Sequence, residues 1–189
     1  MTIQLTKKEG LILLNIARTS IYDKLNQQNK KIEKKFKGTI FYKKRGVFVT
    51  LHKNGHLRGC IGNIEPVDSI ISGVKDNAIN AAFKDSRFSP VKLDELDNID
   101  IEISILTKPE KLEYKGLKDL LSKLKPGIHG VIINKNNRKA TFLPQVWDQL
   151  PDPKNFLSHL CQKAGLSPDE WKNETLEVMI YEIQEFNEK

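Results

Sequence analysis

Cysteine is scarce in this chain. Cys60 and Cys161 are the two cysteines among 189 residues, and they lie far apart in sequence. Such sparse use excludes a disulfide scaffold and is typical of a reducing compartment such as the cytoplasm. Neither cysteine belongs to a C-x-x-C pair, and the four histidines lack the spacing of zinc ligands. We therefore expect no metal site and no cofactor.

Long hydrophobic runs are missing as well. Hydrophobic residues make up 39% of the chain and charged residues 29%, which suits an ordinary globular protein. No apolar run approaches the roughly 20 residues that cross a bilayer. Residues 1–7 also lack the pattern of a signal peptide. We expect a cytoplasmic protein that does not contact a membrane.

Several catalytic motifs are absent. Gly59 to Gly62 lacks the Lys-Ser/Thr pair and the helical context of a phosphate-binding loop. No G-x-S-x-G turn indicates a serine hydrolase. An enzyme of this sequence would therefore have to use another nucleophile, and the cysteines are the candidates.

The charge is strongly basic, with a net charge of +7. A lysine-rich run, Lys30–Lys37, contributes to this balance and could contact phosphates of a nucleic acid. The same run also fits a solvated connector, because acidic residues are interspersed along the chain and no aromatic stacking platform accompanies the lysines. Direct nucleic-acid binding is the less favoured of these two interpretations.

The central stretch of the sequence predicts a β-hairpin. Asn54-Gly55 favours a type I′ turn between two runs rich in apolar residues, 47–52 and 57–61. A two-residue loop places Leu51 opposite Arg58 and Val49 opposite Cys60. Because side chains alternate, each face of the hairpin then carries five of the predicted residues: Val47, Val49, Leu51, Arg58 and Cys60 on one, and Phe48, Thr50, His52, Leu57 and Ile61 on the other.

Hydrophobic periodicity predicts the other elements. Helices are expected from the capping box Thr6–Glu9 to Leu25, and over 67–84, 117–124 and 156–164, with a further capping box at Ser167–Glu170. Strands are expected at 39–42, 98–106, 131–133, 140–143 and 176–186. Hairpins dominate this order, which indicates an α+β fold with mainly antiparallel sheets.

The predicted elements suggest two small α/β-sandwich lobes. The inner lobe covers about 39–107, and the outer lobe combines about 1–38 with 108–189. Hairpin, helix and strand occur in this order twice, although no residue-level repeat accompanies the pattern. We expect a cleft between the lobes, where ligands most often bind.

The Leu57–Gly62 stretch is the candidate functional surface. Cys60 stands between two glycines, which are expected where a strand bulges or where a ligand or backbone approaches closely. Cys60 could be a small buried hydrophobe or a thiolate nucleophile with His129 as its base. The candidate substrate-binding residues are Arg58, Gly59, Gly62, Arg87 and Glu102.

Arg58 predicts an ion pair. An arginine among apolar neighbours needs a carboxylate partner or a wet cleft, because a buried unpaired charge is costly. We expect Glu102 to be this partner in preference to Glu65. Arg87, in the loop expected at 86–91, could bind an anion or tie the loop to a helix end.

A set of short segments resembles one known family over nearly the whole chain. The matching segments, in order, are Leu57–Gly62, Arg87–Pro90, Ile101–Thr107, Gly127–Gly130, Thr141–Val146, Cys161 with Lys163–Leu166, and Trp171. Together they resemble the AMMECR-type domain family, in particular its short prokaryotic members. The biochemical activity of that family is not established, so the resemblance implies a fold more than a function.

The resemblance also implies partners. Prokaryotic members of the family are associated with Memo-like and radical SAM proteins, in a system thought to modify an RNA, a protein or a small molecule. This chain lacks the C-x-x-x-C-x-x-C cluster motif, so it is not the radical enzyme itself. We expect it to bind a substrate or partner at the Leu57–Gly62 surface, with thiol catalysis by Cys60 and His129 as the alternative.

Overall fold

The computed structural model describes residues 4–27, 39–173 and 176–188. The chain divides into two compact units. Met1–Thr107 and Gln184–Lys189 form the first unit, and Lys108–Ile183 form the second. The basic run Lys30–Lys37 lies outside the described residues.

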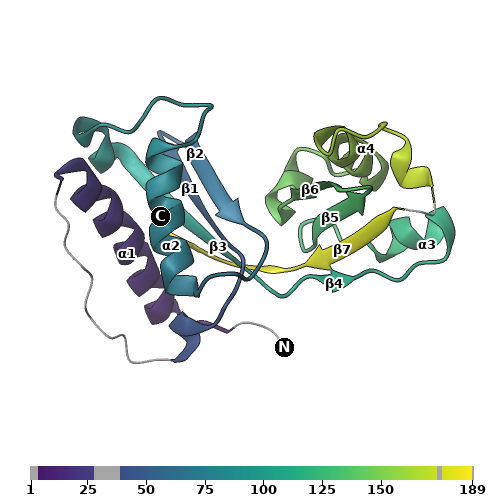
Figure 1. Ribbon diagram of the computed structural model, residues 1–189, viewed down its shortest axis with the longest axis horizontal. Helices are drawn as coiled ribbons and strands as arrows, with labels where there is room; N and C mark the ends of the chain where they lie inside the picture. Colours follow the sequence, from purple (N-terminus) through teal and green to yellow (C-terminus); the bar gives the residue numbers. More distant parts are fainter. Residues whose placement is uncertain (1–3, 28–38, 174–175, 189) are drawn as a thin grey trace. The chain divides into compact units, whose positions relative to one another are not determined.

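The first unit is a four-stranded sheet with two helices on one face (Figure 1). Its strands lie in the order β2-β1-β3-β8, and the pairs of β1 with β2 and with β3 are antiparallel. Its elements are α1 (Lys7–Leu25), η1 (Thr39–Tyr42), β1 (Val47–Lys53), β2 (His56–Asn63), α2 (Ile70–Phe83), η2 (Leu93–Asn98), β3 (Ile99–Leu106) and β8 (Ile183–Asn187).

Alternation and capping explain these elements. Thr6 and Glu9 form the predicted capping box, which satisfies free N–H groups at the start of α1. In β3, the isoleucines at 99, 101, 103 and 105 are all buried. They pack with Val47, Val49 and Leu51 of β1 against the helices. The core of this unit is therefore mainly aliphatic.

The second unit repeats this plan with a different core. Its sheet has the order β4-β7-β5-β6. Trp147 stacks on Phe156 with ring centroids 3.7 Å apart, and Trp171 is buried beside them. Its elements are β4 (Glu110–Lys111), α3 (Gly116–Lys123), β5 (Gly130–Lys135), β6 (Arg138–Phe142), η3 (Pro144–Asp148), α4 (Pro153–Lys163), η4 (Glu170–Lys172) and β7 (Glu177–Tyr181).

The α+β class with mainly antiparallel sheets is confirmed. In each unit the first strand of the hairpin is central, flanked by its hairpin partner and by the strand that follows the helix: β2-β1-β3 and β6-β5-β7. Within the described residues, no helix is both long enough and apolar enough to cross a membrane.

Four expectations need correction. The first helix belongs with the first unit, because its apolar stripe packs in the core of that unit, against α2 and β3. Residues 39–42 form a 3-10 turn and not a strand, and this turn buries Phe41 in the core. The segment 176–186 divides into β7 and β8, one in each sheet. Ser167–Glu170 caps no α-helix and leads into the three-residue η4.

Candidate functional site

The Leu57–Gly62 surface lies on β2, an outer strand of the first sheet. The turn before it is formed as predicted, with positive φ at Asn54 (53°) and Gly55 (79°). These are the left-handed conformations that a type I′ hairpin turn requires at its two central residues. Lys53 pairs with His56 across this turn.

A bulge then changes the register. His52 pairs with Leu57, but Leu51 pairs with Gly59, so Arg58 is an extra residue on β2. The predicted pairs of Leu51 with Arg58 and of Val49 with Cys60 are therefore wrong. Because side chains alternate, one extra residue moves all later residues to the opposite face. The face assignment beyond the bulge fails for this reason.

The bulge places Cys60 in a polar row. Thr50 pairs with Cys60 on one side and with Glu102 of β3 on the other. These three residues therefore share the sheet face opposite the buried Val49 and Leu51. The Glu102 carboxylate lies 3.5 Å from His52 Nε2 on the same face. The predicted site residues Cys60 and Glu102 thus belong to one face of one sheet.

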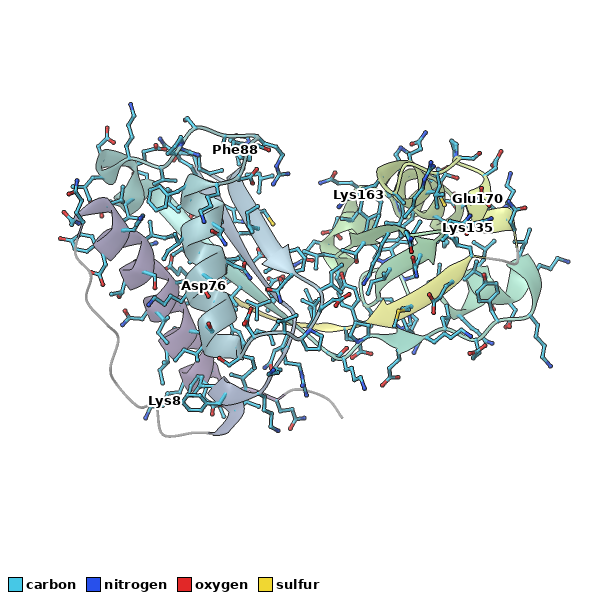
Figure 2. The ribbon with its side chains drawn as sticks, viewed as in Figure 1. Lys8, Asp76, Phe88, Lys135, Lys163 and Glu170 are labelled. Carbon is cyan, nitrogen blue, oxygen red and sulfur yellow. The ribbon has the colours of Figure 1, made fainter. Side chains whose placement is uncertain are left out.

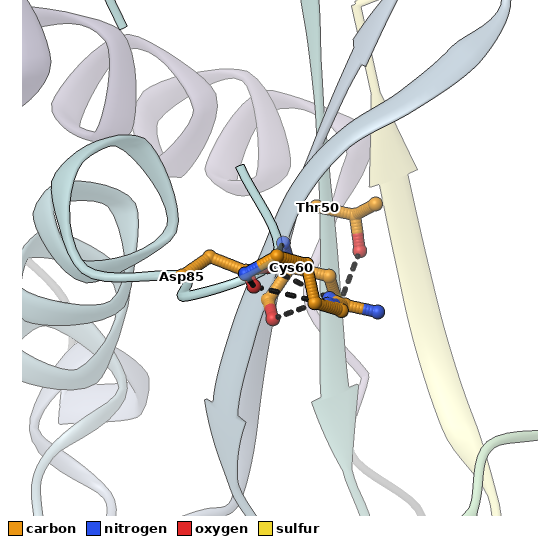
Figure 3. A network of polar contacts seen from close by, with 4 residues as sticks. Thr50, Cys60 and Asp85 are labelled. Carbon is orange, nitrogen blue, oxygen red and sulfur yellow. Dashed lines mark hydrogen bonds and ion pairs between the residues drawn. The ribbon is translucent and has the colours of Figure 1, made fainter. Parts of the chain in front are cut away.

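The thiol of Cys60 is held as a neutral group. Thr50 Oγ1 lies 3.3 Å from Cys60 Sγ in hydrogen-bonding geometry (Figure 3). Burial raises the pKa of the Cys60 thiol, an effect that the Thr50 hydrogen bond and the charge of Arg87 oppose. The ordinary pKa is already about 8.5, so the thiol is protonated at neutral pH. A thiolate nucleophile requires the opposite shift.

Asp85 and Arg87 hold the backbone of Cys60 at the open edge of the sheet. The Cys60 N–H donates to Asp85 Oδ2 over 2.8 Å (Figure 3). Arg87 Nη2 donates to the Cys60 carbonyl over 3.3 Å and to Asp85 Oδ2 over 2.7 Å. Arg87 Nε donates to Asp85 Oδ1 over 2.9 Å. Arg87 therefore ties the loop after α2 to the edge strand β2, whereas the structural role expected of it was to tie the loop to a helix end.

Asp85 is the residue that sequence reasoning missed. Its side chain is 4% exposed, and the hydrogen bonds from Arg87 hold the pKa of its carboxyl well below the ordinary range. A signal was present in the sequence. Asp85 lies two positions beyond the last residue of α2, where the helix dipole disfavours a negative charge. An acidic residue at that position indicates a specific partner.

Arg58 has a carboxylate partner, as predicted, but its identity differs. Arg58 makes a bidentate pair with Glu95 of η2, at 3.0 and 3.1 Å, and neither Glu102 nor Glu65 takes this place. Lys53 joins the same carboxylate at 3.1 Å. The hydrogen bonds from Arg58 lower the pKa of Glu95 to about 2. The pair is largely shielded, with side chains 12% and 13% exposed.

The two glycines allow close packing on opposite faces. A Cβ at Gly59 would lie 2.3 Å from the carbonyl oxygen of Ala81 in α2. A Cβ at Gly62 would lie 2.2 Å from the ring of Phe48. Both distances are far below van der Waals contact. The close approach of another backbone, one of the expectations for these glycines, is therefore found at Gly59, whereas Gly62 makes room for a side-chain ring.

His129 belongs to the second unit, whereas Cys60 belongs to the first. Its Nδ1 accepts from the Lys125 N–H over 3.3 Å, and its carbonyl accepts from Trp147 Nε1 over 2.7 Å. Burial lowers the pKa of His129, so the ring is neutral at pH 7. With Nδ1 as acceptor, Nε2 carries the proton. This tautomer makes Nε2 a donor, which does not suit a general base acting through that atom.

The described part of the chain contains no cluster of side chains that could bind a metal ion. Within residues 4–27, 39–173 and 176–188, no three side chains of His, Cys, Asp or Glu are placed together to hold an ion. The free thiols Cys60 and Cys161 are half-buried and buried, respectively.

Comparisons with known proteins identify relatives of the whole chain. The AMMECR1 family profile matches residues 14–186. A protein of Methanopyrus kandleri is 41% identical, over 98% of this chain and 91% of its own length. A protein of Methanothermobacter thermautotrophicus is also 41% identical, over 97% and 96%. The crystal structure of an uncharacterized protein from Pyrococcus horikoshii superposes with a TM-score of 0.91 at 36% identity, covering 99% of this chain and 95% of that one.

Proposed function

The chain belongs to the AMMECR1 family, and we propose that it binds a substrate or a protein partner at the Leu57–Gly62 surface. One observation carries the proposal. Leu57 is 42% exposed, and the side chain of Arg87, which holds the Cys60 carbonyl on the same strand, is 55% exposed. Cys60, on the same strand, is half-buried. The surface thus exposes Leu57 and Arg87, which can contact a ligand, whereas the Cys60 thiol is only partly accessible.

The position of β2 supports binding. The N–H and the carbonyl of Cys60 are already bound by Asp85 and Arg87, so recognition at β2 would use the side chains that the strand and Arg87 present. Bulges are frequent next to functional sites because they redirect side chains. Arginine is among the residues that most often anchor a protein interface.

The chemistry of Cys60 weighs against catalysis. Catalysis by a thiol requires a low thiol pKa and a base that can accept the proton. Burial raises the pKa of Cys60 instead. His129 presents a protonated Nε2 because its Nδ1 accepts a backbone hydrogen bond. Neither group has the properties that a thiol nucleophile and its base require.

The proposed partners are Memo-like and radical SAM proteins of the same organism. The family resemblance is the support for this choice. The protein would then act as a binding subunit that presents a substrate or holds an assembly together. Binding would be cytoplasmic and would not involve a membrane.

Calorimetric titration with each purified partner tests the proposal. Leu57→Asp should weaken binding at least tenfold, because it places a charge on the contact surface. Val67→Asp is the matched control, since Val67 is 61% exposed in the same unit but lies outside β2. Equal affinity of wild type and Leu57→Asp, or no binding of either partner, would contradict the proposal.

A further inference from the structure

Arg87 is more rigid than an exposed arginine usually is. Its Nε and Nη2 are fixed by Asp85, its Nη2 also by the Cys60 carbonyl. Its guanidinium carbon lies 5.4 Å from the centre of the Phe88 ring, which Figure 2 labels on the loop after α2. We propose that Arg87 receives an oxyanion, a carboxylate or a phosphate, from the ligand of the Leu57–Gly62 surface. This inference rests on the proposed function.

The hydrogen bonds of Arg87 show which side of its guanidinium remains available to a ligand. The hydrogen bonds to Asp85 and Cys60 use Nε and Nη2, and none of them uses Nη1. The side chain is nevertheless 55% exposed. The buried carboxylate therefore holds one edge of the guanidinium and leaves the edge that carries Nη1 directed outward.

A guanidinium held in this way suits an oxyanion. Nη1 keeps its two N–H donors, and a hydrogen bond from a cationic donor to a carboxylate or phosphate oxygen is stronger than one between neutral groups. An arginine that is already fixed loses less side-chain entropy when it binds a ligand than a freely rotating arginine does. If Arg87 had only a structural role, Nε and Nη2, which bind Asp85 and the Cys60 carbonyl, would be sufficient.

The charge of Asp85 limits the affinity. The carboxylate neutralises part of the charge of Arg87, so a small anion alone should bind weakly. We expect dissociation constants for inorganic phosphate or acetate in the millimolar range, roughly 1–10 mM. The contacts of a complete ligand with β2 would add to this weak anchor.

Nuclear magnetic resonance of the wild-type protein tests the inference without any substitution. Inorganic phosphate and acetate are titrated separately at constant ionic strength, with chloride as the reference anion. A saturable shift of the Arg87 Nε–H and Cys60 amide signals is expected, because both groups bind the same Asp85 carboxylate. The stronger of the two anions identifies the phosphate or carboxylate source.

Arg138, which is exposed in the second unit, is the matched control signal. Linear shifts at Arg87 that equal those at Arg138 would mean an adventitious ion only and would overturn the inference. The saturable shift of the Cys60 amide should disappear in Arg87→Gln and weaken several-fold in Arg87→Lys, and should persist in Arg138→Gln.

The partner titration separates this inference from the proposed function. Arg87→Gln should weaken partner binding and make its salt dependence shallower, because one ion pair is lost. If Leu57→Asp abolishes partner binding while Arg87→Gln changes neither affinity nor salt dependence, the oxyanion inference is wrong and the proposed function stands.

Discussion

The two units solve one structural problem with different side chains. In each, the outer strand of the hairpin would expose unpaired backbone groups, which invite association with other chains. Arg87, after α2, donates to the Cys60 carbonyl of β2 over 3.3 Å. Lys163, at the end of α4 (Figure 2), donates to the Thr141 carbonyl of β6 over 3.0 Å. Each cation also lies over a phenylalanine ring.

The two hairpins differ in their register and in the charged residues around Arg87 and Lys163. The hairpin of the second unit has a regular register from Val131–Phe142 to Lys135–Arg138. The hairpin of the first unit has a bulge at Arg58 and two shielded carboxylates, Glu95 and Asp85, that bind arginines. The irregular, charged hairpin is the one that carries the candidate site. The departure from the regular plan therefore coincides with the proposed binding surface.

The cores differ as well, and the largest expected effect tests that difference. Phe156→Ala should lower the free energy of unfolding by about 3–5 kcal/mol, because Phe156 is fully buried and stacks on Trp147. Ile103→Val in the aliphatic core of the first unit should cost only about 1 kcal/mol. Denaturant titrations of both variants measure these values, and a loss below that of Ile103→Val for Phe156→Ala would contradict the aromatic role.

Close approach of α2 to the hairpin predicts the next effect. Gly59→Ala should destabilise the protein by about 3 kcal/mol, because the new Cβ meets the Ala81 backbone oxygen, which cannot move independently of α2. Gly73→Ala is the control on the same interface, since its Cβ would meet only the Val47 side chain, at 3.2 Å. Thermal unfolding compares them, and equal stability of the two variants would refute this account.

Local patterns predicted most of the fold. The capping box at Thr6, the Asn54-Gly55 turn and the isoleucine alternation of β3 each depend on residues a few positions apart. Such signals are complete within the sequence. The grouping of the first helix could not be read in this way, because it depends on contacts between α1 and α2, which are distant in the chain.

The site was harder to predict than the fold, because it too depends on contacts between residues that are distant in the sequence. A bulge is an extra residue with no strong local signal, and it moved Cys60 to the face of Thr50. Glu95 reaches Arg58 across 37 positions, from a 3-10 turn whose position only the folded chain determines. Glu102 was a reasonable choice for an alternating sheet, but it pairs with Thr50 and not with Arg58.

The charged pair in the first unit predicts a pH effect. The pKa of Glu95 is about 2 in the folded protein, below its ordinary 4.5. Its stabilisation is therefore present above about pH 4.5 and is lost as the pH falls toward 2. Glu95→Gln should cost about 1–3 kcal/mol at pH 7 and close to nothing near pH 2.

The matched variant is in the second unit. Glu113 pairs with Lys111, but both side chains are exposed, at 78% and 58%. Glu113→Gln should leave stability unchanged within experimental error at any pH, because solvent screens a pair this exposed. Urea titrations from pH 2 to pH 7 measure both variants. A Glu95→Gln penalty that does not shrink on acidification would contradict the assigned ion pair.

The most direct test is the alkylation rate of Cys60 between pH 5 and pH 9. Cys161 is first replaced by Ala so that one thiol reports, and the folded protein is compared with the same protein unfolded. Because burial raises the pKa of Cys60, the folded thiol should react more slowly than the unfolded thiol at every pH. A folded thiol that reacts faster than the unfolded one at pH 5–6 would reveal a thiolate nucleophile and contradict a binding surface built around a neutral cysteine.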